Sequence, residues 1–244
     1  MLGLDWSYER REVTDEGLAD FLGGLDSTWR GLSLTMPLKR RVAELFDDVD
    51  PVARATRQGN TILLDEGRPV KAFNTDVHGI VQAFADAGVV EAGRATVLGG
   101  GATAQSAVVA LNAMGAEVVV AVRDTAKVAA SGDFPAGARI VALETATDAI
   151  ASSEAVVSTI PPRAEFQVTL PTLGAEQTLL DVAYSPWPTS LASAWQDAGG
   201  SIVHGLEMLL HQAVHQVRVF VCGDPSTPLP DEADVIKAMR AAVE

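Results

Sequence analysis

The sequence contains a single cysteine, Cys222, among its 244 residues. One cysteine cannot form a disulfide within the chain, and it cannot supply the several thiolates of a structural zinc site. The sequence therefore excludes an intrachain disulfide framework and a thiolate metal centre. This cysteine usage fits a reducing compartment.

Positive charge is also scarce, because 18 lysines and arginines stand against 32 aspartates and glutamates, for a net charge of −14. Such a surface repels the phosphates of nucleic acids and of anionic membranes. No apolar run reaches the roughly 18 residues of a membrane-spanning helix, and the charged start at 1–11 does not resemble a signal peptide. We therefore expect a cytoplasmic protein that binds neither nucleic acid nor membrane, and any anionic ligand would need a locally basic pocket.

Three consecutive glycines stand out against this background. Residues 96–98 are typical of a short buried strand, 99–101 of a tight turn, and 102–113 of a helix. The pattern Gly-x-Gly-x-x-Ala from Gly99 fits the dinucleotide fingerprint, in which backbone N–H groups at a helix N-terminus bind a pyrophosphate. Taken alone, the pattern is equally consistent with an ordinary glycine-rich turn.

The second half of the chain alternates short apolar strands with helical segments. This alternation predicts a parallel sheet covered by helices on both faces. Two further helices are expected, at 206–221 and from Asp231 onward, joined by a proline-rich connector. The predicted strands lie at 96–98, 117–122, 139–143, 155–160 and 177–182.

The first half combines strands, helices and one hairpin. Asn74, Thr75 and Asp76 supply N-cap chemistry for a helix that continues to 84. The remaining predictions are strands at 6–13 and 31–36, helices at 17–25 and 39–48, a connector at 51–59, and a hairpin of strands 60–64 and 70–73.

Charged residues follow the predicted strand that ends at 122. Arg123 and Lys127 favour the 2′-phosphate of NADP, whereas Asp124 could accept a hydrogen bond from the plain ribose of NAD. The same group is also compatible with a solvated charge cluster. We expect NADP, with NAD as the alternative.

Lys39 and Asp76 are candidates for acid–base chemistry. Each alone is typical of something simpler, a surface lysine near a helix start and a helix cap. As a pair, an ammonium beside a carboxylate could pass a proton to a ligand while a hydride is transferred at the same carbon. The sequence does not show that the two are close in space.

Glu207, His211 and His215 recur at four-residue spacing, which places them on one face of a helix. Two histidines four apart suit zinc, but the glutamate of the metalloprotease motif is missing and no fourth ligand is evident. We interpret the three residues as a solvated polar face and predict no metal.

Six motifs, in the same order along the chain, resemble those of the shikimate dehydrogenase family. They span nearly the whole sequence, so together they are far more specific than any one of them. The motifs are Thr-x-Pro-x-Lys at 35–39, Gly-Asn-Thr at 59–61, Asn-Thr-Asp-x-x-Gly at 74–79, the glycine-rich loop at 97–104, Asp-x-x-Tyr-x-Pro-x-x-Thr-x-Leu at 181–191, and Gly-x-x-Met-Leu-x-x-Gln-Ala at 205–213.

The resemblance implies an α/β fold with two domains. An α/β substrate-binding and catalytic domain would cover 1–92 plus 205–244, and a Rossmann-like NADP domain with a doubly wound parallel sheet would cover 93–204. It implies reversible NADPH-dependent reduction of 3-dehydroshikimate to shikimate, in the biosynthesis of aromatic amino acids, by a monomer or homodimer. The alternatives are an NAD-dependent quinate/shikimate dehydrogenase and a non-catalytic nucleotide-binding paralogue.

The resemblance also implies residue roles. Lys39 would transfer the proton, with Asp76 as its partner on the substrate hydroxyl. The substrate site would be lined by Thr35, Asn60, Asp76, Tyr184 and Gln212. The pyrophosphate would be held by Gly99, Gly100, Gly101, Ala102 and Thr103, the 2′-phosphate by Arg123 and Lys127, and the nicotinamide would be bordered by Val182 and Gly205.

The sequence departs from the family pattern in two respects. It has no counterpart of the family's first strand and of the Ser-x-Ser loop that binds the substrate carboxylate, so we expect the substrate domain to be N-terminally incomplete. Direct pairing of strands 6–13 and 32–36 in a closed core would contradict that expectation. In the nucleotide domain, Val122, Asp124 and the segment 158–161 differ from the family's usual residues.

Overall fold

The computed structural model describes residues 2–132, 134–164 and 168–243, and the chain forms two compact units. The first unit is made of Met1–Thr75 and Gln212–Glu244, and the second of Asp76–His211. Because the chain leaves the first unit after Thr75 and returns to it at Gln212, its two ends belong to the same unit.

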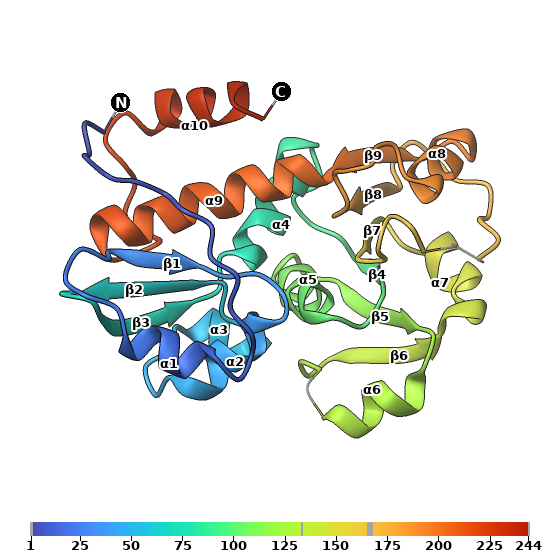
Figure 1. The fold of residues 1–244 in the computed structure, drawn as a ribbon. Coiled ribbons are helices and arrows are strands. Elements are labelled where there is room, and N and C mark those ends of the chain that lie inside the picture. The colour runs from blue at the N-terminus through green and yellow to red at the C-terminus, as the bar shows by residue number, and fades with distance from the viewer. Residues whose placement is uncertain (1, 133, 165–167, 244) are drawn as a thin grey trace. The chain divides into compact units, whose positions relative to one another are not determined.

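The first unit is built on a three-stranded antiparallel sheet in the order β1-β2-β3 (Figure 1). The strands are β1 (Gly31–Ser33), β2 (Thr61–Asp65) and β3 (Arg68–Phe73). Glu66 and Gly67 join β2 to β3 and both have positive φ angles, 46° and 74°, as a tight hairpin turn requires. The predicted hairpin is confirmed.

Helices cover both faces of this sheet. On one side lie α1 (Leu18–Gly23), α2 (Leu38–Leu45) and α3 (Pro51–Thr56), and on the other the second half of α9 (Gly205–Cys222). Because neighbouring residues of a strand point to opposite faces, Ile62 and Leu64 pack beneath the three helices, whereas Leu63 packs with Val219 of α9. The last helix, α10 (Glu232–Ala241), follows α9.

The predicted strand at 6–13 is wrong. Residues 2–13 have no regular secondary structure, and Trp6 and Tyr8 are 48% and 81% exposed. Alternating apolar residues are not sufficient for a strand, because its backbone groups also need a partner strand. Direct pairing of 6–13 with 32–36, which would have contradicted the expectation of an incomplete substrate domain, is therefore not observed.

Two neighbouring boundaries also differ from prediction. The strand expected at 31–36 ends at Ser33, because a turn follows in which the Leu38 N–H donates to the Thr35 carbonyl. The connector expected at 51–59 contains α3, which begins where the Asp50 carboxylate accepts a hydrogen bond from the Ala53 N–H at 2.6 Å. Such a side-chain cap before a proline is a strong helix start.

The second unit contains a six-stranded parallel sheet in the order β6-β5-β4-β7-β8-β9. Numbered within the unit, this is the order 3-2-1-4-5-6 of dinucleotide-binding sheets. The predicted α/β class is confirmed, although β9 was not predicted. The strands are β4 (Arg94–Leu98), β5 (Glu117–Val122), β6 (Ala138–Ala142), β7 (Ala155–Ser158), β8 (Thr178–Asp181) and β9 (Ser201–His204).

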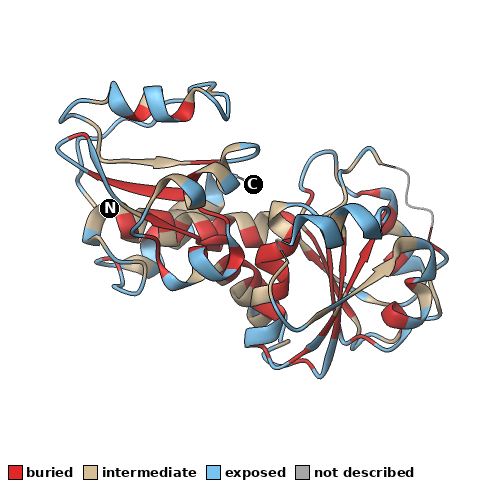
Figure 2. Ribbon diagram, turned by 90° about the horizontal axis from the view of Figure 1, so that it is seen from below, coloured by how far each residue is buried: buried red, intermediate tan, exposed pale blue. Residues whose placement is uncertain are grey.

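Helices flank the parallel sheet, and most of its strand residues are buried (Figure 2). Leu98 and Leu179 pack with side chains of the helices that follow η1 and β8, whereas α5 packs against β4, β5 and β7. No helix among the described residues has the length and apolar character needed to cross a membrane. The helices of this unit are α4 (Asp76–Asp86), α5 (Ala102–Ala113), α6 (Thr125–Ser131), η1 (Leu143–Thr145), α7 (Thr147–Ala151), α8 (Ser190–Asp197) and the first residues of α9.

Candidate active site

Several candidate residues of the first unit meet at one end of its antiparallel sheet. Ser33 pairs with Thr61, and Thr61 pairs with Phe73. The chain therefore leaves β1, enters β2 and leaves β3 at the same end of the sheet, because neighbouring strands run in opposite directions. This brings the segments that carry Thr35 and Asn60 to one end of the sheet.

Asn60 forms a buried hydrogen-bond network at this end. Its side chain is 1% exposed; its Nδ2 donates to Thr75 Oγ1 at 2.9 Å and to Gln212 Oε1 at 3.3 Å, and its Oδ1 accepts from the Thr75 N–H at 3.0 Å. Asn60 and Gln212, both expected at the substrate site, are thus brought together. Thr75 was not expected there, although it lies within the Asn-Thr-Asp motif.

Lys39 lies in the first turn of α2 and is half-buried. Its carbonyl accepts a hydrogen bond from the Gly59 N–H at 2.8 Å. Gly59 has no room for a side chain, because a Cβ there would lie 2.6 Å from Cγ1 of Val42 in the same helix. The backbone just before Asn60 therefore packs directly against α2.

Thr35 and Asp76 have contrasting environments. Thr35 is exposed, in the turn between β1 and α2. Asp76 is buried, is the first residue of α4, and directly follows Thr75 of the Asn60 network. Lys39 belongs to the first unit and Asp76 to the second.

The glycine turn of the second unit follows β4 and has the predicted strand–turn–helix geometry. Gly99 has a φ of 109°, and a Cβ there would collide with Oγ1 of Thr159. Thr159 is fixed in turn, because its N–H donates to the Leu98 carbonyl at 2.8 Å. Both the backbone angle and the neighbouring threonine thus require glycine at this position.

The start of α5 is suited to an anion. Gly101 is the N-cap residue, and no side chain among the described residues caps this helix. A Cβ at Gly101 would meet nothing within 4 Å, so there is open space beside Gly101 at the start of the helix. Uncapped N–H groups at a helix N-terminus, beside β4 and β7 where the strand order reverses, are the kind of group that binds a pyrophosphate in dinucleotide-binding sheets.

The basic candidates lie beside this turn. A Cβ at Gly100 would lie 3.0 Å from Cγ1 of Val122, so β5 ends next to the glycines and Arg123 follows at once. Arg123 and Lys127 are both exposed. The Asp124 carboxylate accepts a hydrogen bond from the Lys127 N–H at 2.8 Å and so caps α6. This acidic residue therefore has a local structural role.

Val182 and Gly205, both expected beside the nicotinamide, are also brought together. A Cβ at Gly205 would lie 2.6 Å from the carbonyl oxygen of Val182, so α9 begins in direct contact with the chain that leaves β8. Tyr184, two residues further on, is 52% exposed.

A buried carboxylate supports this loop. Asp181, at the end of β8, is 1% exposed; it accepts hydrogen bonds from the Thr189 hydroxyl and from the Ala183 N–H at 3.2 Å. Burial raises the pKa of Asp181 above its usual value, and the two hydrogen bonds oppose that rise. Asp181 and Thr189 belong to the motif at 181–191, but the motif alone assigns neither of them a role.

The prediction of a solvated polar face on α9 is wrong for His211, because this residue is only 8% exposed. The structure also separates the three residues: Glu207 and His211 belong to the second unit, whereas His215 belongs to the first and is 3.0 Å from Nη1 of Arg218. Helical spacing gives a shared face, but it does not say what packs against that face.

Comparison with known proteins gives consistent results. The family described as "Shikimate dehydrogenase substrate binding domain" matches residues 1–62. A shikimate dehydrogenase (NADP(+)) from Thermus thermophilus is 31% identical over 243 residues, covering 99% of this chain and 89% of the relative.

Solved structures agree with the sequence comparison. The shikimate dehydrogenase of Mycobacterium tuberculosis is 34% identical, with a TM-score of 0.78 over 98% of this chain and 88% of that one. The shikimate 5-dehydrogenase of Thermus thermophilus, solved with NADP(H) and shikimate, is 30% identical, with a TM-score of 0.80 over 99% of this chain and 90% of that one.

Proposed function

This chain belongs to the shikimate dehydrogenase family, and we propose that it catalyses the reversible NADP-dependent reduction of 3-dehydroshikimate to shikimate. The observation that carries the proposal is the buried network of Asn60, Thr75 and Gln212. These residues come from three separate family motifs, yet they fold into one polar cluster at the end of the first unit's sheet.

The cofactor cradle is the glycine turn at 99–101 with the start of α5. The N–H groups of Ala102 and Thr103 would donate hydrogen bonds to the pyrophosphate, for which the open space beside Gly101 leaves room. Arg123 and Lys127 bind the 2′-phosphate by charge-assisted hydrogen bonds. Val182 and Gly205 border the nicotinamide.

Apart from Asp76, the residues that we assign to the substrate are neutral and polar. Asn60 and Gln212 are held in place by their network, so the positions of both side chains are set before a ligand arrives. Thr35 and Tyr184 are exposed and add hydroxyl groups to the site.

Proton transfer is assigned to Lys39. Bound NADPH supplies the hydride for the carbonyl carbon of 3-dehydroshikimate. The Lys39 ammonium donates a proton to the carbonyl oxygen, which becomes the new hydroxyl, and the neutral amine accepts that proton in the reverse direction. Asp76 is assigned as the partner that accepts a hydrogen bond from the substrate hydroxyl.

Initial rates with shikimate and quinate, each with NADP and NAD, test the proposal. We expect turnover of shikimate with NADP to exceed the other three combinations by at least tenfold. Preference for quinate and NAD would instead support the alternative dehydrogenase. No reaction in any combination, with NADP still bound, would support a non-catalytic nucleotide-binding protein.

Three finer assignments complete the proposal. We place the protein in the cytoplasm, in keeping with its single exposed cysteine. A state of monomer or homodimer, and domain limits of 1–92 plus 205–244 and 93–204, stay predictions that size measurements and limited proteolysis can test.

A further inference from the structure

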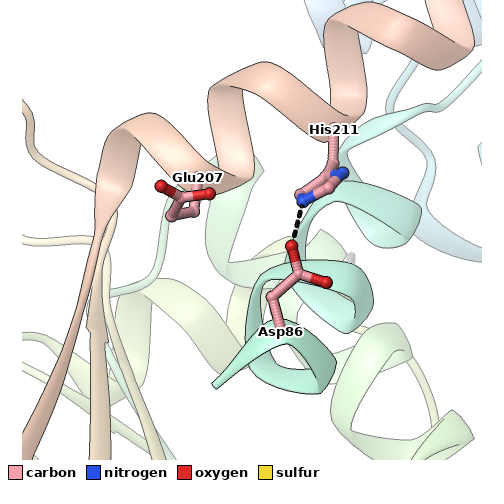
Figure 3. Close-up of side chains that lie close together, drawn as sticks. All are labelled: Asp86, Glu207 and His211. Atoms are coloured by element: carbon pink, nitrogen blue, oxygen red, sulfur yellow. Dashed lines mark hydrogen bonds and ion pairs between the residues drawn. The ribbon is translucent and has the colours of Figure 1, made fainter. Parts of the chain in front are cut away.

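A second polar cluster lies in the second unit, between α4 and α9. Asp86, Glu207 and His211 each direct a side chain toward the space between these helices (Figure 3). Nε2 of His211 is 2.8 Å from Oδ2 of Asp86, and one ligand atom from each of the three residues lies within 4.8 Å of the others. None of the three has a role in the proposed reaction.

The two helices hold these groups in a fixed relation. Glu207 and His211 are four residues apart, so they lie one turn apart on the same face of α9. Asp86 is the last residue of α4, which faces them. His211 is buried and Asp86 is exposed, so the cluster has an anchored inner ligand and an outer edge open to water.

We propose that Asp86, Glu207 and His211 bind one divalent transition-metal ion of the zinc class. A neutral imidazole with two carboxylates carries two negative charges, which such an ion balances. The imidazole favours zinc, cobalt or nickel over magnesium and calcium, which prefer all-oxygen sites. Three protein ligands leave a further position for water at the open edge.

The spacing of the ligand atoms is compatible with this ion. Ligand atoms bound tetrahedrally at about 2.1 Å from a zinc ion lie about 3.4 Å from one another. The contact between His211 and Asp86 would open slightly, and Glu207 would approach by a small side-chain rotation. The three atoms already lie within 4.8 Å of one another, so the displacements needed are small.

The bound ion has a structural role. It joins the C-terminal end of α4 to the start of α9, two helices of the second unit. Its removal is expected to lower the melting temperature of the protein, since an ion that binds only the folded state stabilises it.

Titration of the tag-free, chelator-treated 244-residue protein with Zn²⁺, followed by calorimetry, tests the proposal. We expect one ion per chain with a dissociation constant in the micromolar range or below, and no uptake of Mg²⁺. Titration with Co²⁺ should give the visible absorption of a nitrogen- and oxygen-ligated site. No uptake of Zn²⁺, or a Co²⁺ spectrum showing a thiolate ligand, would overturn the proposal.

Variants assign the ligands. Glu207→Gln and His211→Ala should each weaken Zn²⁺ binding at least tenfold and abolish the rise in melting temperature that Zn²⁺ causes. His215→Ala, which changes a histidine one turn further along α9, and Cys222→Ser, which removes the only thiol, should bind as the unchanged protein does. If His211→Ala fails to fold, Glu207→Gln decides. Unchanged binding in Glu207→Gln, or loss of binding in either control, would refute the assignment.

Discussion

The hydroxyl of Thr189 donates a hydrogen bond to the buried carboxylate of Asp181, and the same oxygen accepts one from the Ala192 N–H at 3.0 Å. One side chain therefore closes the loop that carries Val182 and Tyr184 and also caps α8. The loop that we assign to nicotinamide and substrate is thus held by a residue that touches neither ligand in the proposed mechanism.

Replacement of Thr189 should destabilise the second unit in a pH-dependent way. Thr189→Val removes both hydrogen bonds, and we expect a loss of about 1–3 kcal/mol in the free energy of unfolding. Burial raises the pKa of Asp181 in the folded protein above its value in the unfolded chain. The free energy of unfolding therefore falls as pH rises from the unfolded pKa through the folded pKa, because a buried carboxylate becomes ionised. Without its hydroxyl partner that pKa rises further, so the loss should be larger at pH 8 than at pH 4.5.

Urea unfolding at the two pH values measures this effect. Thr189→Ser keeps the hydroxyl and serves as the control. An equal loss in the serine and valine variants, or a loss independent of pH, would contradict the role assigned to the hydroxyl.

The glycine turn offers a pair of substitutions that separate folding from cofactor binding. Gly99→Ala forces a side chain onto a φ of 109° and into Thr159, so we expect destabilisation of about 1–3 kcal/mol. Gly101→Ala meets no protein atom within 4 Å, so it should keep its melting temperature. Its methyl group would occupy the proposed pyrophosphate position, and NADP affinity should fall at least tenfold. Thermal unfolding and fluorescence titration distinguish the two; normal NADP binding by Gly101→Ala would count against the cradle.

Lys39→Ala tests proton transfer. A general acid–base group contributes about 10²- to 10⁴-fold to the rate, so kcat should fall by that factor while KM for shikimate changes little. Arg41→Ala removes another cation of α2, one that pairs with Glu44. It is a matched control that should leave kcat unchanged. Equal losses in kcat and in substrate affinity would indicate a binding role for Lys39.

Arg123→Ala tests the choice of cofactor. The change removes charge-assisted hydrogen bonds to the 2′-phosphate, so affinity for NADP should fall about 10- to 100-fold. Affinity for NAD, which lacks that phosphate, should stay the same. Titration with both nucleotides is decisive, since matched losses would mean that Arg123 contacts a part that the two share.

The ion pair between Arg218 and Glu232 should make the free energy of unfolding depend on pH in the acid range. Arg218 Nε donates to Glu232 Oε2 at 2.6 Å, which joins α9 to α10 and lowers the pKa of Glu232. A lowered carboxyl pKa stabilises the fold above the unfolded value, and this stability is lost as pH falls through the folded pKa. Glu232→Gln should therefore cost about 1 kcal/mol at pH 7 and progressively less in acid. Glu9→Gln, in an exposed pair with Arg11, should cost nothing measurable in the same urea titrations.

The parallel sheet and its glycine turn could be predicted because their signals are local. Short apolar segments, glycines and small helix-forming residues define each strand–turn–helix unit, and α5 covers the predicted residues 102–113. Strand β9 was missed because its four residues, Ser201–His204, include only two apolar side chains and join α9 without a break.

The candidate site could be predicted only in part, because side-chain partners depend on packing between distant segments. The alternation at 6–13 indicated a strand, but a strand also needs a partner that the pattern cannot supply. Similarly, the spacing of Glu207, His211 and His215 could not reveal that Asp86 faces His211 or that Arg218 contacts His215. Thr75 belongs to the Asn-Thr-Asp motif, but its hydrogen bond to Asn60 joins residues 15 positions apart, and only the fold reveals it.

The cap at the start of α6 has a consequence for redesign of cofactor choice. The Asp124 carboxylate accepts a hydrogen bond from the Lys127 N–H. Serine, threonine or asparagine can fill the same N-cap position without a negative charge. The two cations beside it are exposed and support no part of the core. On the assignment proposed above, an engineer seeking to exchange one nicotinamide cofactor for the other can therefore vary Arg123, Asp124 and Lys127 while leaving the sheet, the glycine turn and the substrate residues unchanged.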